Sequence, residues 1–265
     1  MGLAKRIPSV AVQKMLSVLG THYERHFPTK PEDIPAGKDP KRHFLCHCAL
    51  GTIYQALYAC DVDVDVALPW ARDWFLKYQL PDGGLNCDES AYTRAGAKSS
   101  VLSTLPPLEA VLYCSKKPLT PAEERFLDAG AQYLIDHRIY RSVKTGGVIN
   151  EEWLELCFPR FYQYDILRGL SFLVDWSERR KKPLPRRVIE EPMGLMRAKT
   201  RDHQVCAERV AHAGIMTLQL GGDDTWVKVD AETFELLDRV SAPGTPNPWL
   251  TQSWNRVRGI LGRGY

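Results

Sequence analysis

The sequence predicts a mostly helical protein. Apolar residues recur at helical spacing through most of the chain, and the segments that separate them are short. The clearest helix start is Thr120-Pro121-Ala122-Glu123, a capping box with proline at the first helical position. The alternating pattern of residues 61–66 is typical of a strand, but it is short and lies between helical patterns. We therefore expect a loop there.

The expected helices follow one another along the whole chain. Residues 29–41 are rich in Pro, Asp and Lys and predict a loop, and Gly221-Gly222-Asp223-Asp224 predicts a turn. Pro106 and Pro107 interrupt the pattern of residues 99–114 and are expected to start a helix there. The other expected helices cover residues 10–25, 43–60, 70–79, 120–136, 152–156, 165–179, 185–199, 206–218, 231–240 and 251–261.

Composition limits the classes of function. Lys and Arg number 35 and Asp and Glu 32, and this net charge of +3 gives no electrostatic signature of nucleic-acid binding. No run approaches the roughly 20 apolar residues that cross a bilayer, and the N-terminal residues lack a secretory pattern. Seven cysteines in a long chain favour a reducing compartment, so we expect a cytoplasmic protein without a transmembrane segment.

An ordered set of motifs carries a family resemblance. It begins with Gln79-Leu80-Pro81-Asp82-Gly83-Gly84-Leu85-Asn86-Cys87, where the Gln79 amide is expected to bind carbonyls at a helix end and the glycines to turn the chain. The later members are Ser99-Ser100, Ser103-Thr104, Leu108-Glu109, Leu134-x-x-His137-Arg138-x-x-Arg141-Ser142, Phe158-Pro159-Arg160-Phe161-Tyr162-Gln163-Tyr164-Asp165-Ile166-Leu167-Arg168 and Ser253-Trp254-Asn255-x-x-Arg258.

Over residues 45–260 this set resembles bacterial squalene-cyclase-like proteins of the terpenoid cyclase and protein prenyltransferase superfamily. The resemblance implies an α/α toroid, in which a ring of inner helices lies inside a ring of outer ones. It also implies a central cavity for a small apolar, isoprenoid-like molecule. No linker divides the sequence, so we expect a single domain over residues 1–265, with the N-terminal helix and loop of residues 1–42 packing on it.

The Tyr162-Gln163-Tyr164-Asp165 segment is the first candidate for function. Aromatic rings supply apolar area and can stabilise cations through their π faces. Asp165 is a candidate general acid or base, with Tyr164 beside it, and it is equally a candidate N-cap of the next helix. The remaining candidates for binding a substrate are Tyr162, Gln163, Arg168, Trp254 and His47.

Cys87 and Asp88 follow the glycine turn and form the second candidate. Thiolate and carboxylate groups bind zinc. Protein prenyltransferases bind zinc through an Asp, a Cys and a distant His, so the resemblance implies His203 as a candidate third ligand. Cavity lining and a structural turn are the alternatives. Cys46-His47-Cys48 lies on an apolar helical pattern, where neighbouring side chains point in different directions, so we do not expect these three residues to hold one ion.

Three functional hypotheses follow. The first is an enzyme whose cavity binds an apolar, isoprenoid-like substrate for acid–base chemistry of the cyclase, isomerase or lyase type, with Cys87, Asp88, Tyr164 and Asp165 as catalytic candidates. The second is a zinc-dependent transferase that resembles protein prenyltransferases. The third is a non-catalytic toroid that binds a lipid or a peptide. Fold and function separate readily, so the resemblance does not choose among them.

Overall fold

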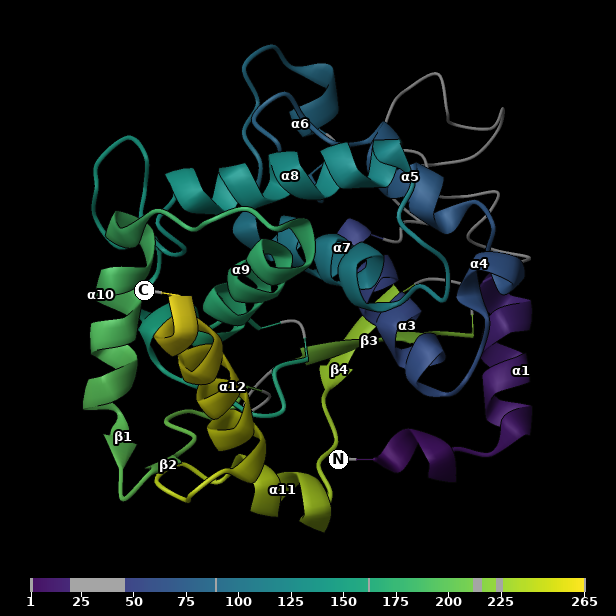
Figure 1. Cartoon of the computed structure of the whole chain (residues 1–265). Coiled ribbons are helices and arrows are strands. Elements are labelled where there is room, and N and C mark those ends of the chain that lie inside the picture. The colour runs from purple at the N-terminus through teal and green to yellow at the C-terminus, as the bar shows by residue number, and fades with distance from the viewer. Residues whose placement is uncertain are drawn as a thin grey trace. The chain divides into compact units, whose positions relative to one another are not determined.

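The computed structural model describes residues 2–19, 46–88, 90–161, 163–211, 216–222 and 226–264 (Figure 1). The chain divides into two compact units, Met1–Tyr133 and Leu134–Tyr265, and each is described by itself. Helices dominate both units, as the sequence predicts, and strands are few and short among the described residues.

Every named element among the described residues of the first unit is a helix. Its elements are η1 (Leu3–Arg6), α1 (Ser9–Val18), α3 (His47–Ala59), α4 (Val64–Ala67), α5 (Ala71–Lys77), α6 (Ser90–Thr93), α7 (Val101–Tyr113) and α8 (Pro121–Asp136), the last of which crosses the boundary between the units. The expected loop of residues 61–66 contains one helical turn, α4. The expected loop of residues 29–41 lies outside the described residues.

Helices α3 and α7 form the centre of the first unit, and they lie side by side (Figure 1). A Cβ at Gly51 would lie 2.5 Å from the carbonyl carbon of Pro106, so only glycine allows the two backbones to approach this closely. Gln55 then donates from Nε2 to the carbonyl oxygen of Pro106 at 3.2 Å. The expected helix start at Pro106 is wrong, because α7 runs through both prolines and this contact with α3 supports it there.

The capping box at the start of α8 is confirmed. The Glu123 backbone N–H donates to the Thr120 hydroxyl at 3.2 Å, and the Thr120 N–H donates to the Glu123 carboxylate at 2.7 Å. The same carboxylate accepts a hydrogen bond from Arg72 of α5 at 2.5 Å. Glu123 of the capping box therefore also links α8 to α5, through its buried ion pair with Arg72.

The second unit combines helices with two small hairpins. Its elements are η4 (Glu151–Leu154), α9 (Ile166–Arg180), α10 (Arg186–Ala198), β1 (Thr200–Arg201), β2 (Gln204–Val205), β3 (Met216–Leu220), β4 (Trp226–Asp230), α11 (Glu235–Ser241) and α12 (Pro248–Gly264). Helix α9 packs against both α10 and α12 (Figure 1). The predicted N-cap of α9 is confirmed, since the Asp165 carboxylate accepts from the Arg168 N–H at 2.8 Å.

The helix expected over residues 206–218 is wrong in its described part. Strands β3 and β4 pair antiparallel, with Met216 opposite Asp230 and Leu220 opposite Trp226. Cys206 instead forms an isolated bridge with Pro246. The Trp-Val-Lys-Val-Asp sequence of β4 alternates as a strand does, and pairing with it overrides the helical spacing of the earlier segment.

Candidate metal centre

The turn after α5 brings Cys87 to the start of α3. Gly83 has a φ of 91°, and a Cβ there would lie 2.3 Å from the carbonyl oxygen of Ala129, so the turn requires glycine on both counts. Gln79 donates from Nε2 to the carbonyl oxygens of Gly83 at 2.8 Å and Phe126 at 2.9 Å. Its amide thus ties the turn to α8, whereas the sequence predicted that it binds carbonyls at the end of its own helix.

Three cysteine thiols converge at this point. Cys46 is the N-cap of α3, Cys48 is in the first turn of that helix, and Cys87 follows the glycine turn. The Sγ atoms of Cys46 and Cys48 are 3.0 Å apart, and those of Cys48 and Cys87 are 3.6 Å apart. All three Sγ atoms lie within 4.8 Å of one another. The group is therefore small enough to surround one ion.

The sequence predicts that Cys46, His47 and Cys48 do not hold one ion together, on the assumption that all three residues are helical. His47 is indeed outside the group of thiols, but Cys46 and Cys48 both belong to it. Cys46 instead has an extended backbone, with φ −75° and ψ 156°, and the helix begins only at His47. Helical spacing therefore does not apply to Cys46, and its Sγ lies 3.0 Å from that of Cys48.

The three thiols perturb one another electrostatically. Hydrogen bonds from Cys48 and then Cys87 lower the pKa of the Cys46 thiol to about 3, against the effect of burial. The hydrogen bond with Cys46 is the main cause that raises the pKa of Cys48, and a separate interaction of Cys87 with Cys46 is the main cause that raises the pKa of Cys87 to about 11. The group thus favours one negative charge, centred on Cys46, in its metal-free form.

Polar and aromatic groups surround the thiols. The backbone N–H of Ala49 acts to lower the pKa of the Cys46 thiol, and the buried Ser103 hydroxyl acts to lower the pKa of the Cys87 thiol. His47 is fully buried, and burial lowers its pKa to about 3, so its imidazole is neutral. The His47 ring lies 5.4 Å from the Tyr78 ring and 5.9 Å from the Tyr92 ring, between ring centroids. The wall beside the thiols is therefore largely aromatic.

The other two residues of the expected zinc set lie outside this group. Asp88 follows Cys87 but is exposed. His203 belongs to the second unit, where it is exposed in the turn between β1 and β2 with a φ of 63°. Among the described residues, the group of metal-binding side chains is Cys46, Cys48 and Cys87. Sequence reasoning found only Cys87 of these three as a ligand.

The candidates around Asp165 form a separate group in the second unit. Asp165 is fully buried, and its carboxylate accepts from Arg160 Nε at 2.7 Å as well as from the N-terminus of α9. Tyr164 is also buried, and its hydroxyl donates to the carbonyl oxygen of Ile139 at 2.8 Å. Both side chains are thus engaged in holding the segment before α9 in place.

The remaining residues of the second unit that the sequence predicted to bind a substrate are Arg168, Gln163, Trp254 and Tyr162. Arg168 donates from Nη1 to the carbonyl oxygen of Gln163 at 2.9 Å, and Gln163 is half-buried. Trp254 is 1% exposed and belongs to the core contributed by α12. Tyr162 lies outside the described residues. These contacts support a structural role for Trp254 and leave Arg168 close to Asp165.

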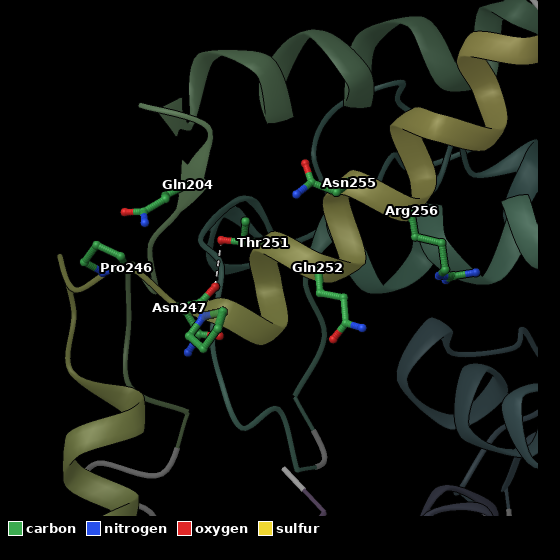
Figure 2. Close-up of a pocket in the computed structure, with 8 residues that line it drawn as sticks. Gln204, Pro246, Asn247, Thr251, Gln252, Asn255 and Arg256 are labelled. Carbon is green, nitrogen blue, oxygen red and sulfur yellow. Dashed lines mark hydrogen bonds between the residues drawn. The ribbon is translucent and has the colours of Figure 1, made fainter.

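A pocket of about 670 Å³ lies along one face of α12 in the second unit (Figure 2). Gln252, Asn255 and Arg256 of α12 line it, with Gln204 of β2 across from them. Arg256 forms an ion pair with Asp175 of α9. The lining of this pocket includes none of the site residues that the sequence predicted.

In comparisons with known proteins, no family model matches the sequence, and neither a curated protein nor a solved structure matches the chain. The resemblance to squalene-cyclase-like proteins thus remains a prediction from motifs. Within the described part of the chain, no helix has both the length and the apolar character needed to cross a membrane.

Proposed function

We propose that this protein binds one zinc ion through the thiolates of Cys46, Cys48 and Cys87 and acts as a zinc-dependent transferase. The observation that carries the proposal is the convergence of three Sγ atoms within 4.8 Å of one another. The α/α toroid, the single domain and the cytoplasmic location belong to the same proposal.

The distances fit a tetrahedral thiolate site. A Zn–S bond is about 2.3 Å long, so two thiolates on one tetrahedral zinc lie about 3.8 Å apart. The separation of Cys48 and Cys87, 3.6 Å, is close to this value. The separation of Cys46 and Cys48, 3.0 Å, needs to widen by under about 1 Å. Both are far longer than the roughly 2.05 Å of a disulfide bond.

The donor atoms favour zinc among the common ions. Thiolates select zinc, Cu(I) or iron–sulfur clusters over calcium and magnesium, which prefer oxygen ligands. The N–H of Ala49 and the hydroxyl of Ser103 favour the thiolate forms of Cys46 and Cys87, and outer polar groups of this kind support metal ligands.

Three protein ligands favour a catalytic role over a structural one. Structural zinc sites have four protein ligands, whereas catalytic sites keep one position for water or substrate. In the parts of the chain that are described, no fourth Cys, His, Asp or Glu joins the group. The rings of His47, Tyr78 and Tyr92 pack on one another, so the surroundings of this helix start are largely aromatic.

Acid–base chemistry of the cyclase, isomerase or lyase type has less support. It needs Asp165 or Tyr164 to exchange protons with a substrate. Both are buried, and their polar atoms are engaged with Arg160, the backbone of α9 and Ile139. The non-catalytic toroid remains the outcome if zinc binds and no transfer activity accompanies it.

Metal content tests the proposal directly. Protein purified without chelator is expected to hold about one zinc per chain by elemental analysis, and Cys48→Ser and Cys87→Ser are expected to lose it. Cys60→Ser is the matched control, because Cys60 is half-buried in the same unit but lies outside the group. Zinc-free wild-type protein, or equal zinc in Cys60→Ser and Cys87→Ser, would contradict the proposal.

The open fourth position has its own test. Cobalt substitution is expected to give a tetrahedral spectrum with thiolate-to-metal charge transfer, and an added small thiol is expected to shift the ligand-field bands by occupying that position. His203→Ala is expected to leave both spectra unchanged, because His203 is exposed in the turn between β1 and β2. Loss of metal in His203→Ala would give the site a fourth protein ligand and contradict the transferase proposal.

A further inference from the structure

Helices α10 and α12 of the second unit leave a further pocket between them, with a volume of about 380 Å³. Both helices pack on α9 (Figure 1). The β1–β2 hairpin ties the end of α10 to the start of α12, since β1 follows α10 directly and the Val205 N–H of β2 donates to the Thr251 hydroxyl of α12 at 2.9 Å. The two helices therefore run in opposite directions along this pocket, which we call the α10–α12 groove.

The floor of the α10–α12 groove is apolar. Ile189 and Met193 of α10 and Leu261 of α12 line it, and all three belong to the core of the second unit. Gly262 of α12 also lines it, and nothing lies within 4 Å of a Cβ built at this position. The groove thus offers free space beside an apolar floor, and an apolar chain that fills this space leaves water.

Arginines line the rim of the groove, and the two on α10 differ in their pairing. Arg186, in the first turn of α10, lies 3.9 Å from the Glu190 carboxylate, which partly cancels its charge. Arg197, in the last turn, forms no ion pair among the residues that the structure describes. A rise of about 1.5 Å per residue places the two arginines roughly 16 Å apart along the helix axis. The uncancelled charge of α10 therefore lies at one end of the groove.

Arg258 of α12 adds a second positive charge to the rim. Its Nη2 donates to the side-chain oxygen of Asn255 at 3.0 Å, and this amide carries no charge. Within the described part of the chain, no carboxylate pairs with Arg258. Arg258 precedes Leu261 and Gly262 along α12, so it is the lining residue of this helix nearest to the Arg197 end. The groove is thus cationic toward that end and apolar beyond it.

We propose that the α10–α12 groove binds a single-chain lipid with an anionic head group. Arg197 and Arg258 hold the carboxylate or phosphate of the head through charge-assisted hydrogen bonds. The chain covers the apolar floor toward Gly262. The volume of the groove falls within the range of about 300–1,000 Å³ that is typical of small-molecule sites. The site lies wholly in the second unit, so its failure would leave the zinc centre untouched.

Calorimetry with short probes tests the chemistry of the site. Octanoate, octyl phosphate, 1-octanol and octylammonium are titrated into the full chain below the concentrations at which they form micelles. Both anions are expected to bind at least about fivefold more tightly than octanol, and octylammonium most weakly, because the rim is cationic. Decanoate is expected to bind up to about 15-fold more tightly than octanoate, since each buried CH₂ adds about fourfold. The tighter of the two anions identifies the head group as carboxylate or phosphate.

Two glycine variants test where the chain lies. Gly262→Trp is expected to weaken decanoate binding about tenfold or more, because the indole occupies the space that the chain would fill. Gly194→Trp is the matched control, since Gly194 is an exposed glycine of α10 with equally free space that does not line the groove. Far-UV circular dichroism checks the fold of both, and Gly262→Leu serves as the smaller substitution if Gly262→Trp unfolds.

The arginines are tested by their effect on head-group preference. Arg197→Gln and Arg258→Gln are each expected to weaken octanoate binding about threefold or more and to leave octanol binding unchanged. A merely structural role would weaken the binding of both probes alike. Arg187→Gln is the matched control, because Arg187 is exposed on α10 but lies outside the lining of the groove.

Four results would overturn the proposal. One is wild-type protein that binds octanoate no better than octanol or octylammonium. Another is a folded Gly262→Trp with wild-type affinity for decanoate, or an equal loss in Gly194→Trp. A third is an octanoate preference that survives in both Arg197→Gln and Arg258→Gln. The last is a dimer, detected by light scattering and lost in Gly262→Trp, which would mean that a second copy of the chain covers the groove.

Discussion

The Sγ atoms of Cys46 and Cys48 lie 3.0 Å apart because a helix begins between the two residues. Cys46 is extended and Cys48 is helical, so a change of backbone conformation over one peptide brings both thiols to one side. Cys87 completes the group from the turn after α5. A helix start of this kind is thus able to present two ligands from a single short segment.

A chelator is expected to destabilise the wild-type protein. Zinc that binds only the folded state adds about 4 kcal/mol of stability when the free ion is a thousandfold above its dissociation constant. Thermal unfolding with and without a chelator measures this difference. Cys48→Ser is expected to unfold at the same temperature in both conditions, and a chelator-sensitive Cys48→Ser would contradict the assignment of ligands.

Ser103→Ala is expected to weaken zinc binding without unfolding the protein. The Ser103 hydroxyl favours the thiolate form of Cys87, and loss of such an outer polar partner of a metal ligand costs about 10- to 100-fold in metal affinity. Competition with a chromophoric chelator measures the affinity. The unfolding midpoint of the metal-free variant is the control, and a variant with wild-type zinc affinity would show that Ser103 only packs there.

Gly51→Ala is expected to destabilise the first unit by about 1–3 kcal/mol or more, because the new Cβ would lie 2.5 Å from the carbonyl carbon of Pro106. Gly194→Ala in α10 is the contrasting control. Nothing lies within 4 Å of a Cβ at Gly194, so alanine is expected to stabilise that helix by about 0.5–1 kcal/mol. Urea unfolding of both variants measures the difference, and similar effects would rule out the close approach of α3 and α7.

Acid is expected to weaken the ion pair between Glu123 and Arg72. Burial acts to raise the pKa of Glu123, but hydrogen bonds from Thr120 and Arg72 outweigh it, so the folded-state pKa is lowered. The stabilisation is therefore fully present above the unfolded pKa of about 4.3 and is lost as the pH falls through the lower, folded value.

Glu123→Gln tests this dependence. Removing one partner of a buried ion pair costs about 3 kcal/mol, so the variant is expected to be less stable than wild type at neutral pH by roughly that amount. The gap is expected to narrow as the pH falls below about 4. Urea unfolding as a function of pH measures it, and a gap that stays constant would mean that the carboxylate charge contributes nothing.

Local signals in the sequence predicted local structure well. Thr120 and Glu123 form the expected capping box. Asp165 caps the N-terminus of α9, which is one of the two roles that the sequence predicted for it. Each of these features depends on hydrogen bonds between residues three apart. The choice between catalysis and capping for Asp165 required knowledge of its contact with Arg160, which lies five residues away in the sequence.

Features that depend on distant contacts were missed. Helix α7 continues through Pro106, where Gly51 and Gln55 of α3 lie against it, and a helical pattern read along one segment does not reveal this contact. The strand over Met216–Leu220 depends on its pairing with Trp226–Asp230. The thiol group depends on the extended backbone of Cys46, where the sequence lacks the Ser, Thr, Asp or Asn that commonly marks a helix start.

The separation of Cys48 and Cys87 along the chain is 39 residues, and the segment between them contains α4, α5 and the glycine turn. An ion held by both residues would act as a crosslink, and the unfolded chain would lose conformational entropy each time it closed that loop. A crosslink in this place would therefore make the order of folding events depend on when the ion arrives.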